Sequence, residues 1–185
     1  ILKFIKLKTI LHVEDYFDPE AGYQINELLK ISKPDVTQSL ITSKDMSPFH
    51  KELNIDKDIE FEALYNVKIY RLDILFKVSS RLILKGLGRL INKINPDLLY
   101  LHGIGDFKDL WLFKSKLKYT VVRDCHMSWV ASQNKFAKLY LYLYSIIFAR
   151  IINKSNKYTT VFALGEEEKQ YLLKMGVSEN KISML

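Results

Sequence analysis

The side chains with the clearest chemical use follow two short apolar runs in the middle of the chain. Arg123, Asp124 and His126 end one of these runs, and His102 ends the other. An imidazole exchanges protons near neutral pH and can hydrogen-bond a phosphate or a hydroxyl group, while a nearby carboxylate can orient it or act as a base. The sequence therefore predicts catalytic roles for His126 and Asp124, and binding roles for His102 and Arg123.

A glycine near the N-terminus is a second candidate. Gly22 follows an apolar run and a Pro-containing loop, and a helix is expected to begin near Ala21. Backbone N–H groups at a helix N-terminus attract anions, and a glycine there allows a phosphate to approach closely. We therefore predict that Gly22 binds phosphate. Tyr23 and Gln24 follow it on the same helix, and Tyr23 is also a candidate core residue.

Composition excludes several classes of protein. The chain has 185 residues, of which 48% are hydrophobic and 26% charged, as in ordinary globular domains. Its single cysteine cannot form an internal disulfide, and its histidines are too scattered for a structural zinc site. No secretory leader is visible, and the longest uncharged apolar run, 139–149, is too short to span a bilayer. We expect a cytoplasmic protein of a single domain.

Short apolar runs alternate with longer amphipathic segments along the chain. Apolar runs that alternate with helices favour a parallel sheet with helices on both faces, whose ligands bind beyond the carboxyl ends of the strands. The segment at 43–62 is acidic and irregular, so we expect a surface loop. The predicted strands are 9–13, 36–42, 67–72, 98–102, 119–123 and 159–164, and the predicted helices 21–31, 77–94, 109–113, 134–153 and 166–175.

The positive charge is concentrated in one part of the chain. The net charge is +7, and residues 63–157 alone carry 17 basic and 5 acidic side chains, a local excess of +12. On the predicted helix 77–94, the basic residues recur every fourth position and would form one charged face. That face is either solvated, or rests on anionic lipid, or binds nucleic acid. Its apolar neighbours lack the interleaved aromatics of a base-stacking platform, so we expect no nucleic acid. The five basic residues are Lys77, Arg81, Lys85, Arg89 and Lys93.

Four stretches, in the same order, resemble the N-terminal half of family-4 glycosyltransferases. The loop and helix at 16–24 are similar to that family's first loop, and Asn-Pro-Asp at 95–97 precedes a strand that ends in His-Gly. The strand at 121–126 resembles the family's next strand, which ends in histidine. The segment at 166–182 looks like the exit from the first domain.

The resemblance implies one half of a GT-B enzyme, in which two Rossmann-like domains face each other across a cleft. Residues 1–185 would be the N-terminal, acceptor-side domain, and a C-terminal domain absent from this chain would bind the nucleotide-sugar donor. The fragment would then be inactive. The implied acceptor is a cell-surface polysaccharide or a lipid-linked glycan, which Tyr23 and Gln24 would contact, at the inner face of the membrane. The transfer would need no metal or other cofactor.

Two other hypotheses remain open at this point. The chain could be a non-catalytic Rossmann-like module that binds a phosphorylated ligand or an anionic membrane surface, or half of an epimerase with the same two-domain plan. Asp56-Lys57-Asp58 spells the Asp-x-Asp of metal-dependent glycosyltransferases, but it lies in the charged segment 43–62, so we predict no metal there. The apolar helix near 135–154 is expected either to be buried against the sheet or to touch a membrane.

Overall fold

The structure is a computed structural model that describes residues 8–31, 33–78, 80–111, 119–126 and 137–185. It contains a seven-stranded sheet with the order β3-β2-β1-β6-β7-β8-β9 and a separate two-stranded sheet, β4-β5. The chain divides into two compact units, 1–100 and 101–185, which are described separately below. The predicted class, an α/β Rossmann-like fold with a parallel sheet, is confirmed.

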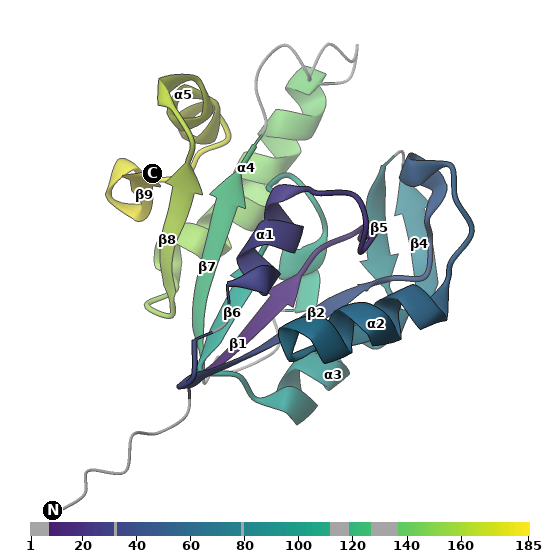
Figure 1. The fold of residues 1–185 in the computed structure, drawn as a ribbon. Coiled ribbons are helices and arrows are strands. Elements are labelled where there is room, and N and C mark those ends of the chain that lie inside the picture. The colour runs from purple at the N-terminus through teal and green to yellow at the C-terminus, as the bar shows by residue number, and fades with distance from the viewer. Residues whose placement is uncertain (1–7, 32, 79, 112–118, 127–136) are drawn as a thin grey trace, which may run out of the picture. The chain divides into compact units, whose positions relative to one another are not determined.

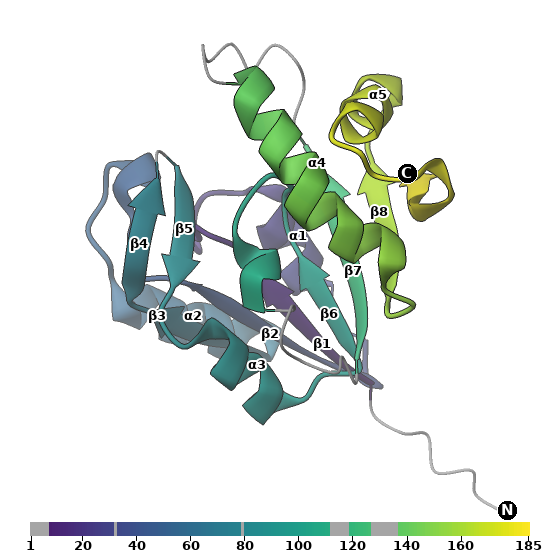
Figure 2. The same cartoon turned by 180° about the vertical axis from the view of Figure 1, so that it is seen from behind.

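The first unit is built on three parallel strands. Strand β1 pairs with β2, and β2 with β3, so that His12 lies opposite Leu40 and Leu40 opposite Ile69. Helices α1 and α2 cover one face of these strands and α3 the other (Figures 1 and 2). The elements are β1 (Lys8–Val13), α1 (Gln24–Lys30), β2 (Val36–Ser43), the 3-10 turn η1 (Ser47–Phe49), α2 (Ile55–Tyr65), β3 (Val67–Leu72), β4 (Ile74–Val78), β5 (Arg81–Leu84), α3 (Leu87–Ile94) and β6 (Leu98–Leu101).

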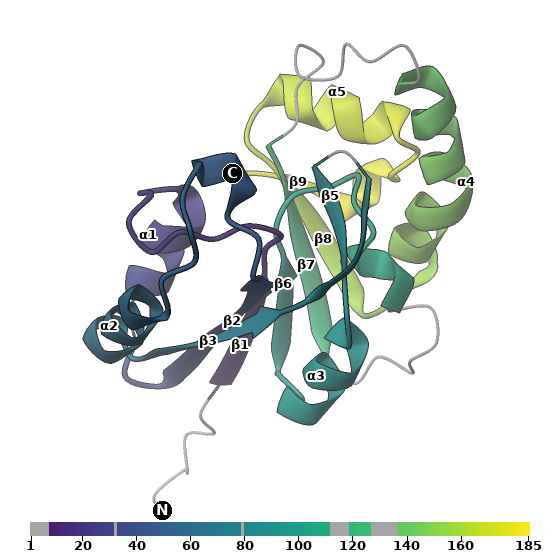
Figure 3. The ribbon, with the colours of Figure 1, turned by 90° about the vertical axis from the view of Figure 1, so that its right-hand side faces the viewer.

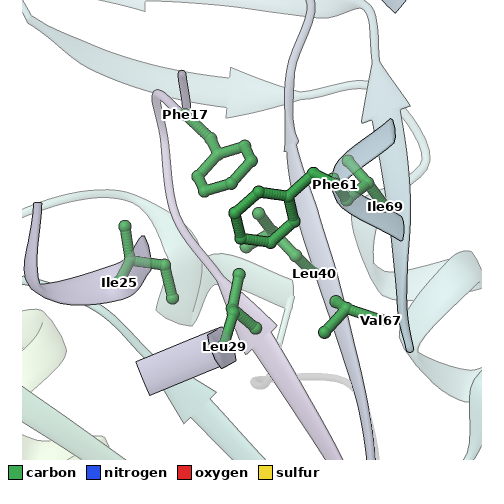
Figure 4. Packing of buried hydrophobic residues seen from close by; sticks show 7 residues of the cluster. All are labelled: Phe17, Ile25, Leu29, Leu40, Phe61, Val67 and Ile69. Atoms are coloured by element: carbon green, nitrogen blue, oxygen red, sulfur yellow. The ribbon is translucent and has the colours of Figure 1, made fainter. Parts of the chain in front are cut away.

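An apolar cluster holds α1 and α2 on the strands (Figure 4). Its two phenylalanines, Phe17 and Phe61, meet edge to face with ring centroids 5.5 Å apart. Leu40 lies beneath them on β2. Such buried aromatic and aliphatic side chains supply most of the stabilising burial of a small unit. The cluster comprises Phe17, Ile25, Leu29, Leu40, Phe61, Val67 and Ile69.

In the second unit, strand β7 pairs in parallel with β8, and β8 with β9. Helix α4 contacts β8, and α5 contacts β8 and β9 (Figure 3). Gly176 follows the end of α5 with a φ of +85°, and its carbonyl accepts a 2.8 Å hydrogen bond from Asn153 of α4. The elements are η2 (Lys108–Trp111), β7 (Thr120–Cys125), α4 (Ala137–Lys154), β8 (Tyr158–Ala163), α5 (Glu166–Lys174), η4 (Glu179–Lys181) and β9 (Ile182–Met184).

Helix α4 has two different apolar faces. Tyr144, Phe148 and Ile152 are buried, whereas Leu143 and Ile147 are exposed. The sequence indicates that this helix is either buried or touches a membrane. Burial is observed for one of its faces only. Among the described residues, no helix is both long and apolar enough to cross a membrane.

The predicted helix at 77–94 is wrong over its first half. Residues 74–78 and 81–84 form the two antiparallel strands of the hairpin β4–β5, and the helix begins only at Leu87. Gly86 adopts a φ of +79°, which ends the hairpin and prevents a continuous helix. The basic residues therefore do not form one helical face. Only Arg89 and Lys93 lie one turn apart on α3.

The prediction of an irregular surface loop at 43–62 is also wrong. Its second half is helix α2, which Asn54 caps by accepting hydrogen bonds from the backbone N–H groups of Asp56 and Lys57. Asp58 lies buried on α2 and forms two hydrogen bonds with Arg71, at 2.7 and 2.8 Å. One of the two aspartates in this Asp-x-Asp motif is therefore a structural residue that is paired with an arginine.

Candidate functional site

Asp124 lies at the centre of the candidate site in the second unit. It occupies the penultimate position of β7 and is fully buried. Its Oδ2 lies 2.9 Å from Nδ1 of His102, and its Oδ1 lies 3.0 Å from Nε2 of His126. Oδ1 also accepts a 2.6 Å hydrogen bond from the backbone N–H of Gly103. One carboxylate of the second unit thus contacts the residues that directly follow Leu101 and Cys125.

These contacts determine the charge of Asp124 and the orientation of both rings. Burial would raise the pKa of Asp124, but hydrogen bonds from His102 and His126 outweigh it and hold that pKa far below its usual range. An ionised carboxylate only accepts hydrogen bonds, so the nitrogen of each ring that faces it carries the proton. The side chain of His102 is buried, whereas that of His126 is 37% exposed. Of the two rings, that of His126 is therefore the one that reaches the surface.

The turn that follows β6 is held in place by its neighbours in the second unit. Gly103 has a φ of +75°, and its carbonyl accepts a 2.7 Å hydrogen bond from Nε of Arg123. Nζ of Lys108 donates a 2.9 Å hydrogen bond to the carbonyl of His102. Asp124 accepts a hydrogen bond from the N–H of Gly103, and Arg123 donates one to its carbonyl. Two adjacent residues of β7 therefore bind both backbone polar groups of this glycine. The position of the His102 ring is therefore determined by a rigid backbone.

A buried group of charges lies beside this turn. The guanidinium of Arg123 contacts the carboxylates of Asp106 and Asp109, and Lys108 lies 3.0 Å from Asp106. The hydroxyl of Tyr158 donates a 3.1 Å hydrogen bond to Asp109. Two carboxylates thus balance two cations, which is the condition under which buried charges are tolerated. Arg123, predicted to bind phosphate, is instead enclosed and fully engaged by protein groups.

The two carboxylates of this group differ in their pKa shifts. For Asp106, burial would raise the pKa, but the charges of Arg123 and Lys108 outweigh it and lower the pKa to about 2. For Asp109, burial dominates over the attraction of Arg123, and the pKa is raised. The two shifts have opposite signs. As the pH falls, protonation of Asp106 lowers the free energy of unfolding, whereas protonation of Asp109 raises it.

Acid unfolding should therefore report on Asp106. Its lowered pKa means that its stabilisation is complete above about pH 4 and is lost as the pH falls toward 2, a loss of about 2 kcal/mol. We expect Asp106→Asn to flatten the fall in urea midpoint across this range. The exposed Asp35→Asn should leave that fall unchanged. Equal slopes for both variants and the parent would contradict the assignment.

Gly22, Tyr23 and Gln24 belong to the first unit. Helix α1 begins at Gln24 rather than near Ala21, because Tyr23 is extended and its N–H donates a 3.2 Å hydrogen bond to Oδ1 of Asn26. Gly22 adopts a φ of +66°, which favours glycine at this position. Tyr23 is exposed, so its alternative as a core residue is wrong.

Gly22 lines a hollow of about 250 Å³ in the first unit. Lys57 lies in its wall, 3.4 Å from Glu20 and 3.2 Å from Glu60, two acidic residues of the same wall. Asn26, which sequence analysis did not select, is fully buried and holds the loop before α1 through hydrogen bonds to the carbonyls of Asp18 and Pro19. Roles in phosphate or acceptor binding for Gly22, Tyr23 and Gln24 stay predictions.

Within the second unit, the structure brings three of the predicted residues, His102, Asp124 and His126, into direct contact. Sequence analysis missed Asp106, Lys108 and Asp109, whose charged cluster directly after the Gly-Ile-Gly turn was the available signal. In the described part of the chain, no three His, Cys, Asp or Glu side chains are placed to hold a metal ion. That the reaction needs no metal stays a prediction.

Comparison with known proteins places the fold. No family model and no curated protein matches the sequence. Among solved structures, HepE from Anabaena in complex with UDP and glucose superposes with a TM-score of 0.55 at 12% identity, over 96% of this chain and 44% of that chain. HepE with UDP-glucose matches with a TM-score of 0.56, at 12% identity, over 96% of this chain and 43% of that one. A glycosyltransferase from Rickettsia africae matches with a TM-score of 0.54, at 16% identity, over 96% and 42%.

These likenesses define the class of fold. The chain has the α/β architecture found in a glycosyltransferase and in a protein crystallised with a nucleotide sugar. It spans less than half the length of each of these structures.

Proposed function

We propose that the chain is the N-terminal, acceptor-side domain of a nucleotide-sugar-dependent glycosyltransferase of the GT-B type, similar to family 4. The observation that carries the proposal is the pairing of buried Asp124 with the partly exposed His126 at the end of β7. The fold shared with HepE, which was solved with UDP-glucose, supports it. A C-terminal domain would supply the donor site, in keeping with the partial coverage of the structural neighbours.

In the proposed reaction, Asp124 holds the ring of His126 in place, and the exposed imidazole receives the proton of the acceptor hydroxyl or hydrogen-bonds the transferred sugar. The ionised Asp124 orients the ring and stabilises the imidazolium that forms. His102, on the other oxygen of Asp124, keeps the carboxylate in place. The proposed acceptor is a cell-surface polysaccharide or a lipid-linked glycan at the cytoplasmic face of the membrane, and the proposed transfer uses no metal.

The experiment combines the mass of the native protein with a donor screen. A native chain roughly twice as long as this one would contain a second domain of similar size. We expect that protein to release the nucleotide from one of a panel of nucleotide sugars when acceptor is present, and the 185-residue chain alone to release none. A native chain of this length without a companion donor domain would contradict the proposal.

A second candidate is a non-catalytic module that binds a phosphorylated ligand or an anionic surface. The basic side chains of α3 and of the turn before it favour this candidate. Nucleotide-sugar turnover separates the two, because a binding module would retain the ligand and leave it intact.

A further inference from the structure

In the hairpin β4–β5, buried and partly exposed residues alternate along β5, whereas no residue of β4 is buried. Leu82 and Leu84 of β5 are buried, and Lys77, opposite Leu82, donates hydrogen bonds to Asp45 and Ser47 on the body of the first unit. The alternation of side chains along a strand therefore turns Phe76 and Val78 outward. These two residues are 59% and 44% exposed. The hairpin forms a sheet of its own, separate from β1–β3 (Figure 2).

The outward face combines apolar and basic side chains in a fixed pattern. Phe76 lies opposite Ile83, and Val78 opposite Arg81. Lys85 continues the alternation of Arg81 and Ile83 immediately beyond β5. The apolar pair Phe76–Ile83 thus has a cation on each side. Leu75, at the bulge in β4, adds a further side chain that is 60% exposed.

Three basic side chains lie exposed on this side of the unit. Lys85, Arg89 and Lys93 are exposed, and across the described ranges none of them forms an ion pair. Asp73, whose backbone carbonyl accepts a hydrogen bond from the N–H of Lys85, is already paired with Lys44 at 2.9 Å. The hairpin and α3 therefore present an excess of positive charge beside exposed apolar side chains.

We propose that the outward face of β4–β5 docks the protein on an anionic lipid bilayer. Phe76, Val78 and Leu75 would enter the interfacial layer, while Arg81 and Lys85 would meet lipid phosphates. A second copy of this chain fits less well, because a symmetric pairing of this face brings two sets of basic side chains into one interface. Nucleic acid fits less well too, because Phe76 is the only aromatic residue of the hairpin. The proposal does not depend on the transfer reaction.

Sedimentation with lipid vesicles tests the proposal on the chain as it stands. We expect binding to vesicles of phosphatidylcholine mixed with phosphatidylglycerol, little binding to phosphatidylcholine alone, and release at high salt. Arg81→Glu/Lys85→Glu should weaken binding at least roughly 25-fold, since each cation near an anionic surface contributes roughly five-fold. Phe76→Ser should weaken it roughly ten-fold.

Matched control variants test whether vesicle binding depends on the hairpin or only on net charge and exposed apolar side chains. Lys33→Glu/Lys157→Glu makes the same charge change at exposed sites elsewhere, and Ile59→Ser removes an exposed apolar side chain from α2. Both should bind vesicles nearly as the parent does. Arg81→Gln/Lys85→Gln gives a milder change if the charge reversal disturbs folding.

Four results would overturn the proposal. The first is no binding to the anionic vesicles, and the second is equal loss in hairpin and control variants. The third is loss only with Leu143→Ser, which would place the contact on the exposed face of α4. The fourth is a dimer that Phe76→Ser converts to a monomer, which would make a second copy the occupant.

Discussion

Replacement of Arg123 by methionine is expected to lower the free energy of unfolding by about 3–5 kcal/mol. The variant leaves Asp106 and Asp109 buried together, with Lys108 as the remaining cation of the group. It also removes the donor to the carbonyl of Gly103. An uncompensated buried charge costs more than the intact pair contributes, so the loss should exceed that of ordinary core substitutions of similar size.

Urea unfolding at neutral pH measures this effect. Arg150→Met makes the same chemical change at an exposed site on α4 and should shift stability by less than about 0.5 kcal/mol. Adding Asp109→Asn to Arg123→Met should restore part of the loss, because it removes one of the two unpaired carboxylates. If Arg123→Met cost no more than Arg150→Met, the buried charge group would have no part in stability.

The second large effect concerns the reaction. In the proposed two-domain enzyme, we expect Asp124→Asn to lower kcat about 10²–10⁴-fold, the range typical of general acid–base groups. Asparagine can neither accept hydrogen bonds at both of its terminal atoms nor stabilise an imidazolium, so His126 loses its orientation and its counter-charge. His126→Ala should cost a similar factor.

A double variant tests whether the two residues act together. If Asp124 and His126 act as one unit, Asp124→Asn/His126→Ala should lose little more activity than either single variant. His50→Ala removes an exposed histidine of the first unit and should leave kcat unchanged. Thermal unfolding of each variant distinguishes loss of catalysis from loss of fold. Full activity of His126→Ala would contradict the assigned role.

Local patterns predicted most of the sheet correctly. The strands expected at 36–42, 67–72 and 159–164 lie within one residue of β2, β3 and β8 at each end. Apolar runs bounded by turn residues identify buried strands because both faces of a parallel sheet are covered. The third strand of the second unit, β9, was missed because it has only three residues, Ile182–Met184.

The basic segment shows why spacing alone was insufficient. A repeat of four residues is close to one helical turn, but it is also twice the period of a strand, so both structures place the repeat on one side. The hairpin then places the basic residues on different sides. Lys77 faces the body of the unit, whereas Arg81 lies beside the outward Val78. Gly86, with its positive φ, marks the change to helix.

For the site, the sequence identifies chemistry at the ends of strands, because Asp124 and His126 follow an apolar run whose end must reach the rim of a sheet. It cannot assign partners, since these depend on which strand lies beside which. His102 meets Asp124 across 22 positions of the chain. Arg123 is enclosed because Asp106 and Asp109 neutralise it, and a sequence alone does not reveal whether a charge is buried or solvated. Residue type therefore determined what each group can do, and tertiary packing decided which of them a ligand can reach.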